Sequence, residues 1–198
     1  MKPLFRFAAV LLFAVLTVPA AEAQTMTSLF DFAQSADTQS SDAAKWQIVN
    51  DGVMGGRSSS QASIVKLDTG EDAMRFAGNL SLENNGGFAS VRSGPSGSLG
   101  LDPGETIVLR VKGDGRRYTF NLYTPDRRTA FSYQMEFATT AGQWTEVKLP
   151  IDQFVAHSFG RRIPGMKLRP SQVQSIGILL GDKKPGPFEI LIDSIMVQ

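Results

Sequence analysis

Cysteine is absent from this chain of 198 residues, and histidine occurs only once. A chain without cysteine forms no disulfide, no thiolate metal site and no cysteine nucleophile. Basic and acidic residues nearly balance, at 20 and 19, so there is no excess of positive charge to attract a phosphate backbone. The composition therefore favours a globular domain without disulfides, and we expect no nucleic-acid partner.

Sustained helical periodicity is also missing. Instead, about ten short segments with alternating or apolar patterns are separated by turn signals roughly every 8–12 residues. Residues 117–124 are the clearest case, because Tyr118, Phe120 and Leu122 alternate with polar or smaller partners. The pattern predicts a single all-β domain, a sandwich or a barrel. We expect its edge to be closed by pairing of the first strand, near residues 29–32, with the last, residues 188–197.

The N-terminus carries a targeting pattern. Lys2 and Arg6 precede an apolar run over residues 7–18, and Ala21 and Ala23 place small residues before a cleavage site at Gln24. This arrangement is typical of a secretory signal peptide. The run is shorter than the ~20 residues that cross a bilayer. The sequence thus predicts a signal peptide over residues 1–23, a domain over residues 24–198, and an exported protein, periplasmic or secreted, with no membrane span after cleavage. An uncleaved N-terminal anchor is the alternative.

Two glycine-rich stretches, residues 46–58 and 76–92, combine glycine pairs with polar and basic side chains. Glycine pairs permit tight turns or the close approach of another group. Neither stretch leads into a helix with Lys-Ser or Lys-Thr, so a phosphate-binding loop is not predicted. After Gly87 the strand alternation places Phe88, Ser90 and Arg92 on one face.

Two interpretations of these stretches remain open. In the first, the glycines only form turns and the arginines pair with nearby acids. In the second, Asp51, Arg57, Asn85 and Arg92 form a polar floor that binds a ligand or partner, since the guanidinium fork suits carboxylates, phosphates and backbone carbonyls. The full candidate set for the second interpretation is Asp51, Met54, Gly55, Gly56, Arg57, Ser58, Asn85, Gly86, Gly87, Phe88, Ser90, Arg92 and Tyr123.

Tyr123 belongs to this set for a separate reason. Most aromatic side chains fall on the apolar side of alternating strands, where core packing explains them. Tyr123 instead shares a face with Asn121 and Thr119. An aromatic ring beside an amide could stack on a sugar ring, which suggests a carbohydrate ligand.

Metal binding and catalysis have little support in the sequence. Asp31 and Asp193 offer hard oxygen ligands for a structural calcium ion near the terminal strands, although no dense acidic loop is present. No other cofactor is predicted. His157, the single histidine, is not near a nucleophile elbow. Paired carboxylates could hydrolyse a glycan, and the available glutamates are Glu83, Glu105, Glu136, Glu146 and Glu189.

The glycine-rich stretches also carry a family resemblance. The octet from Asp51 to Ser58 and the run from Asn85 to Arg92 resemble the complex I intermediate-associated protein family, the CIA-thirty domain, and segments around Trp144, Asp152 and residues 186–193 agree. The resemblance implies a galactose-binding-like jelly-roll β-sandwich and a non-enzymatic binding protein that assists assembly of a protein complex in a chaperone-like way. The alternative is an exported carbohydrate-binding module, and a glycan-acting enzyme is less favoured. The partner would be a protein of the cell envelope or a glycan.

Overall fold

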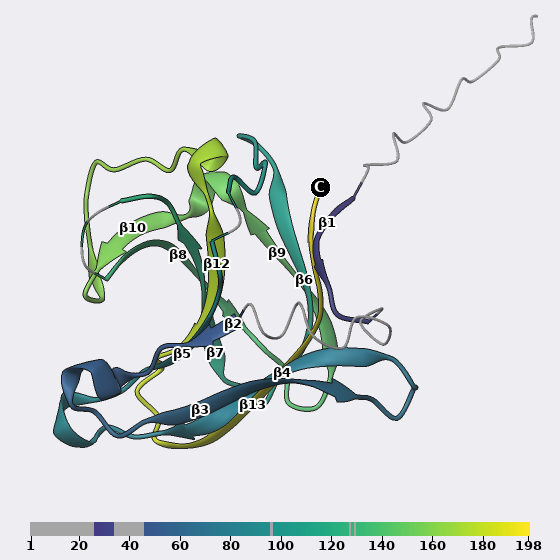
Figure 1. Ribbon diagram of the computed structural model, residues 1–198, viewed down its shortest axis with the longest axis vertical. Coiled ribbons are helices and arrows are strands. Elements are labelled where there is room, and N and C mark those ends of the chain that lie inside the picture. The colour runs from purple at the N-terminus through teal and green to yellow at the C-terminus, as the bar shows by residue number, and fades with distance from the viewer. Residues whose placement is uncertain (1–25, 34–45, 96, 127, 129) are drawn as a thin grey trace, which may run out of the picture.

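Thirteen strands form two antiparallel sheets in the computed structural model, which describes residues 26–33, 46–95, 97–126, 128 and 130–198 (Figure 1). Sheet A has the order β3 (Ser59–Lys66), β4 (Asp72–Leu80), β13 (Gly186–Val197), β6 (Thr106–Lys112) and β9 (Trp144–Pro150), with β1 (Thr27–Asp31) also paired to β13. Sheet B has the order β11 (Arg161–Arg162), β10 (Val155–Ser158), β8 (Phe131–Ala138), β7 (Arg117–Tyr123), β12 (Ser175–Leu180), β5 (Ala89–Ser93) and β2 (Trp46–Ile48). The predicted all-β sandwich is confirmed.

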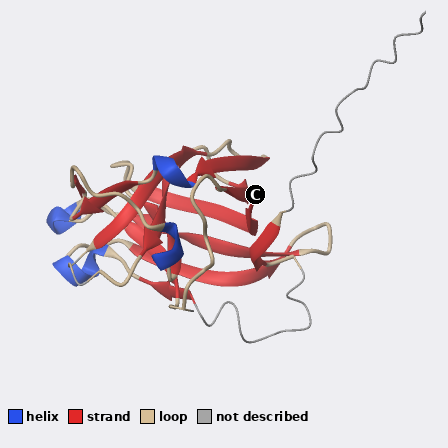
Figure 2. Cartoon of the chain, turned by 90° about the horizontal axis from the view of Figure 1, so that it is seen from above, coloured by secondary structure: helices blue, strands red, loops and turns tan. Residues whose placement is uncertain are grey.

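Short 3-10 helices lie in the loops rather than in the layers (Figure 2). They are η3 (Asp51–Met54), η4 (Glu83–Asn85), η5 (Ile151–Gln153) and η6 (Pro170–Gln172). No helix in the described part of the chain is long and apolar enough to cross a membrane.

The core lies between the two sheets and follows from strand alternation. On β7, Tyr118, Phe120 and Leu122 are fully buried, while the residues between them point to the outer face of sheet B. Ile190 and Ile192 on β13 close the core from sheet A in the same way. Burial of large apolar side chains from both layers is the main stabilising contribution to such a fold.

The ends of the described chain pair as predicted. β1 runs antiparallel to the last part of β13, with Thr27 opposite Val197 and Asp31 opposite Ser194. Just after β1, Phe32 is fully buried, and its ring lies 6.0 Å from that of Trp46 on β2. The N-terminal strand therefore closes sheet A and also contacts an edge strand of sheet B.

The strands β10 and β11 were not predicted. β10 has four residues and β11 has two, and both lie at the edge beyond β8. Segments this short contain too few residues for periodicity to be recognised. They form because β8 offers β10 an unpaired edge, with His157 opposite Ser132 and Arg162 opposite His157.

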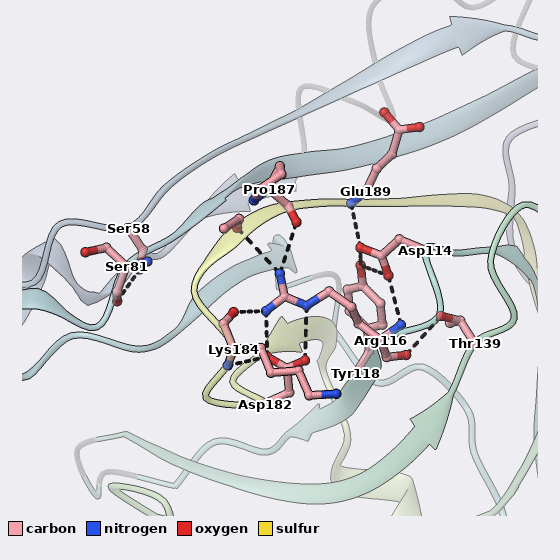
Figure 3. A network of polar contacts seen from close by, with 11 residues as sticks. Ser58, Ser81, Asp114, Arg116, Tyr118, Thr139, Asp182, Lys184, Pro187 and Glu189 are labelled. Atoms are coloured by element: carbon pink, nitrogen blue, oxygen red, sulfur yellow. Dashed lines mark hydrogen bonds and ion pairs between the residues drawn. The ribbon is translucent and has the colours of Figure 1, made fainter.

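A buried ion pair joins the segment before β7 to the connection between β12 and β13 (Figure 3). Arg116 donates from Nε and Nη2 to the two carboxylate oxygens of Asp182, at 3.0 and 2.6 Å. The same guanidinium donates to the carbonyl of Pro187 at 3.1 Å and to that of Lys184. Arg116, directly before β7, thus contacts Asp182, Lys184 and Pro187 along the connection from β12 to β13.

Candidate partner-binding site

The Asp51 carboxylate is the centre of the predicted region, and it is fully buried. One oxygen, Oδ1, accepts a hydrogen bond from the Ser58 backbone N–H at 2.9 Å. The other, Oδ2, accepts from the Ser58 hydroxyl at 2.6 Å, the Gly87 N–H at 2.7 Å and the Phe88 N–H at 3.3 Å. We call Asp51, Ser58, Gly87 and Phe88 the Asp51 clamp, because the carboxylate joins the loop before β3 to the loop before β5.

Ser58 extends the clamp to a third segment. Its hydroxyl oxygen accepts a hydrogen bond from the Ser81 backbone N–H at 3.0 Å (Figure 3). Ser81 directly follows β4, so both glycine-rich stretches are anchored where β3 begins and β4 ends.

One glycine of each pair is explained by how closely the Asp51 carboxylate approaches its backbone. A Cβ atom at Gly56 would lie 2.4 Å from Asp51 Cγ, and one at Gly86 would lie 2.6 Å from Asp51 Oδ2. Both distances are far below van der Waals contact, so only glycine leaves room for Asp51 to reach its donors.

The clamp holds Asp51 in its charged form. Burial by itself raises the pKa of Asp51, but the hydrogen bonds from Ser58, Gly87 and Phe88 outweigh burial and lower the pKa below its ordinary value. N–H and O–H donors therefore stabilise a buried negative charge at neutral pH. This is the arrangement of a structural anchor rather than of a ligand contact.

Outside the clamp, the same loops expose apolar side chains. Val53 and Met54 in η3 are 75% and 54% exposed, and Leu82 before η4 is 41% exposed. We call these three residues the apolar tip. An ion pair bridges the two loops beside it, with Arg57 Nη1 2.9 Å from Glu83 Oε2 at the surface. A rigid base with exposed apolar groups is typical of a contact surface for another protein.

The four polar residues proposed as a floor do not converge. Asp51 is sealed inside the clamp, Arg57 pairs with Glu83, and Asn85 lies exposed in η4 with a φ of 59°. Arg92 lies apart from them, on β5 in sheet B. The loops are thus brought together as the motif suggests, but Asp51 acts from inside. Ser90, also in the candidate set, donates its hydroxyl to the Val49 carbonyl at 2.5 Å.

Arg92 and Tyr123 form a second feature, on the outer face of sheet B. The guanidinium carbon of Arg92 lies 3.6 Å from the centre of the Tyr123 ring. β12 runs between them, and its Gly177 is opposite Arg92 on one side and Asn121 on the other. A Cβ at Gly177 would lie 3.1 Å from the Tyr123 ring, so this glycine makes room for the stack. One face of the ring predicted to bind sugar is therefore covered by Arg92.

Polar side chains continue across the sheet from Tyr123. The Ser132 hydroxyl donates to Asn121 Oδ1 at 3.0 Å, and Gln134 Nε2 donates to the Ser132 hydroxyl at 3.0 Å. Asn121 and Ser132 are almost fully buried although they lie on the outer face. Burial raises the pKa of Tyr123, and the nearby Arg92 charge partly offsets that rise.

The proposed calcium ligands lie on paired strands but make other contacts. Asp31 Oδ1 accepts a hydrogen bond from the Ala33 N–H at 3.1 Å, and Asp193 Oδ2 lies 3.8 Å from Arg110 Nε. No group of three or more His, Asp or Glu side chains that could hold a metal occurs within the described residues. Calcium binding stays a prediction.

Several of the glutamates considered for glycan hydrolysis pair with basic side chains or cap a turn. Glu189 lies 2.5 Å from Arg75 and Glu146 lies 3.5 Å from Lys148. Glu105 accepts a hydrogen bond from the Asp102 N–H at 2.7 Å. With the Arg57–Glu83 ion pair, these contacts give ordinary structural roles to four of the five candidates.

Two hollows contain none of the residues predicted to bind a ligand or partner. One, of about 680 Å³, is lined by polar and apolar residues of β3, β4 and β13, with Asp114, on the outer face of sheet A. The other, of about 410 Å³, lies under residues 162–170. Neither includes the clamp, the apolar tip or Arg92.

The glycine-rich clamp falls inside a known family pattern. Residues 30–192 match the model of the complex I intermediate-associated protein 30 family. The chain belongs to this family. The mouse mitochondrial protein of that name is 31% identical to this chain, and the match covers 79% of this chain and 52% of the mouse protein. The Neurospora crassa protein is 29% identical, and that match covers 61% of this chain and 50% of the Neurospora protein. The chain thus spans about half the length of these curated relatives.

Solved structures confirm the β-sandwich fold predicted from the resemblance. A family 11 carbohydrate-binding module from Clostridium thermocellum, solved with a mixed-linked tetrasaccharide, has a TM-score of 0.61 with 16% sequence identity, over 87% of this chain and 94% of the module. Identity this low shows the shared fold alone.

The predicted location is wrong. The curated relatives from mouse, Neurospora crassa and Caenorhabditis are all named as mitochondrial proteins, which contradicts an exported, periplasmic or secreted protein with a secretory signal peptide. Residues 1–23, on which that prediction was based, lie outside the described residues. The error arose because a targeting segment is recognised by composition alone, and no contact with the sandwich could test it.

Proposed function

We propose that this chain is a non-enzymatic assembly factor that binds a protein component of a complex I intermediate, and that the apolar tip makes the contact. Family membership supports the assembly role, since the curated relatives are named for complex I intermediates. The observation that carries the proposed contact is the Asp51 clamp, which uses four hydrogen bonds to one buried carboxylate to hold Val53, Met54 and Leu82 outward.

Rigidity is what makes the tip suitable for binding. Exposed apolar side chains gain free energy when a partner covers them, at about 25 cal/mol per Å² of apolar surface removed from water. A mobile loop would lose part of that gain in ordering, whereas a loop already fixed by Asp51 would lose less. The glycine-rich motif would then supply the Asp51 clamp that supports the apolar tip, rather than the side chains that touch the partner.

The test is capture of partners by the tagged full chain in cells that assemble complex I. We expect recovery of complex I subunits, identified by mass spectrometry, and loss of that recovery in the double variant Val53→Asp and Met54→Asp. The control is Met26→Asp, which places one such charge on another exposed methionine, 47% exposed and next to β1; Met54→Asp alone is the single-charge variant to compare with it. Equal recovery by the tip variant and the control would contradict the proposal.

Carbohydrate binding is the second candidate. The observation that favours it is the partly exposed Gln134 amide, which hydrogen bonds through Ser132 to Asn121 on the same face as the Tyr123 ring. Saturable binding to a glycan array that is lost on Tyr123→Ala would favour it. Binding that survives Tyr123→Ala, or no glycan binding, would count against a sugar site on this face.

A further inference from the structure

Arg92 carries a positive charge without a matching anion. Within the described part of the chain it takes part in no ion pair, whereas Arg57 and Arg116 each pair with a carboxylate at 2.9 Å or less. Its Nε is buried and has no hydrogen-bond partner among the described residues. The Tyr123 side chain is a hydrogen-bonding and stacking neighbour of this guanidinium but supplies no negative charge. The charge therefore stays uncompensated among the described residues, and an anion at the terminal nitrogens would pair with it.

The Arg92 side chain is also held in place. Stacking on Tyr123 at 3.6 Å fixes the plane of the guanidinium, and Gly177 provides the space for that stack. Arginine loses little further freedom when its planar fork is already oriented, so a carboxylate that approaches its terminal nitrogens meets a prepared site.

The surrounding face is basic. The outward positions of the described strands of sheet B carry three arginines, Arg92, Arg117 and Arg162, and one glutamate, Glu136. Strand pairing also places His157 between Ser132 and Arg162 at the far edge of this face. An acidic ligand is therefore favoured over a basic one by charge complementarity.

We infer that Arg92, stacked on Tyr123, receives a carboxylate from an acidic side chain of the protein partner. A carboxylate matches the guanidinium fork through two parallel hydrogen bonds. Neither of the two hollows described above includes Arg92, and this favours a carboxylate presented by the surface of a larger molecule over a free small acid. The carboxylate site stands on the Arg92 geometry alone, while its assignment to a protein partner rests on the proposed function.

Fluorescence anisotropy of the full chain with a fluorescein-labelled hexaglutamate peptide tests the site directly, with a hexaglutamine peptide as the neutral reference. We expect saturable binding of hexaglutamate at low salt, weakened about five-fold or more by Arg92→Gln, because a charge-assisted pair is lost. Arg57→Gln removes the same charge from an exposed arginine and should change affinity by less than about two-fold. Arg92→Lys keeps the positive charge but loses the planar fork, so its affinity for hexaglutamate should lie between those of Arg92→Gln and Arg57→Gln. If Arg92→Gln does not fold, Arg92→Lys serves as the test variant.

The outcomes separate this inference from the proposed function. No saturable binding, or equal weakening by Arg92→Gln and Arg57→Gln, would overturn the carboxylate site. Peptide binding that depends on Arg92, with capture of complex I subunits unchanged in Arg92→Gln, would overturn the assignment to the partner and leave the proposed function intact. Loss of both in Arg92→Gln supports the inference. Glycan binding that requires Arg92 would overturn it in favour of a sugar ligand.

Discussion

The backbone N–H of Gly87 donates to the Asp51 carboxylate at 2.7 Å and joins two segments that are 36 residues apart in the chain. This single contact relates the two glycine-rich stretches to each other. The sequence pattern suggested a ligand-binding floor, but the contact shows that Asp51 is an internal anchor. The candidate contact surface lies on the outer side of the two loops. The clamp accounts for one glycine of each pair, because Gly56 and Gly86 lie where any side chain would meet the Asp51 carboxylate.

A methyl group at Gly86 should disrupt this anchor. In Gly86→Ala the new Cβ would lie 2.6 Å from Asp51 Oδ2 and 2.9 Å from the Glu83 carbonyl oxygen. We expect the free energy of unfolding, measured by urea denaturation, to fall by about 2–3 kcal/mol from overpacking. Gly52→Ala is the matched control, since a Cβ there has no neighbour within 4 Å and should change stability by less than about 0.5 kcal/mol. Equal effects at the two positions would show that close approach to Asp51 is not the reason for glycine.

Replacing the clamp carboxylate should cost stability in a pH-dependent way. In Asp51→Asn the amide nitrogen cannot accept a hydrogen bond, so donors from Ser58 or Gly87 lose their acceptor, at a cost of about 2–4 kcal/mol near neutral pH. Because the folded pKa of Asp51 lies below the unfolded value of about 3.9, its stabilising contribution is complete above that pH and is lost as pH falls through the folded pKa. Urea titrations at several pH values should therefore show the difference between wild type and Asp51→Asn shrinking below about pH 4. A difference that stays constant down to the acid limit would contradict a charged, clamped carboxylate.

The ion pair beneath the β12–β13 connection should be far more important than the one at the apolar tip. Arg116 and Asp182 have side chains only 11% and 7% exposed, whereas those of Arg57 and Glu83 are 65% exposed. Removing one partner of a buried pair leaves an uncompensated charge, so Arg116→Gln should lower the free energy of unfolding by about 3–5 kcal/mol. Arg57→Gln should lower it by no more than about 1 kcal/mol. Thermal unfolding of the two variants side by side checks the order, and a larger loss in Arg57→Gln would refute it.

Closure of the sandwich by β1 should be visible in stability. Phe32 is fully buried beside Trp46, so Phe32→Ala should cost about 3–5 kcal/mol through lost burial and a cavity. Met26→Ala, at an exposed position before β1, should have little effect. If Phe32→Ala left the urea midpoint unchanged, the first strand would not be an integral part of the domain.

The fold could be predicted wherever burial imposes a local pattern. β7 and β8 were recognisable because one face of each strand enters the core, and alternation records this residue by residue. β10 and β11 were not, because they are stabilised by pairing with β8 and not by a pattern of their own. The Arg116–Asp182 pair was equally invisible, since its members are 66 residues apart and lie in unremarkable turn sequences.

The contact between the two glycine-rich loops was predictable, but the direction in which Asp51 points was not. The glycine pairs and polar residues correctly indicated that two distant loops form one feature. An aspartate in a turn is compatible with exposure to a ligand and with burial among N–H donors, and Asp51 takes the second course. Tyr123 was recognised as lying on the polar face, but no strand pattern indicates that Arg92 would cover its ring.

The amino-acid sequence was enough to determine that the domain is all-β, that it lacks cysteine chemistry, and which face of its long strands is buried. It also showed that the glycine-rich loops resemble those of one family. Tertiary structure alone decided that Asp51 turns inward and that Val53 and Met54 face solvent. It also decided that Arg92 stacks on Tyr123 and pairs with no carboxylate of the described residues. The reason is that side-chain alternation is a property of neighbouring residues. Satisfying a buried charge, by contrast, requires donors from distant segments, and only the folded chain brings these together.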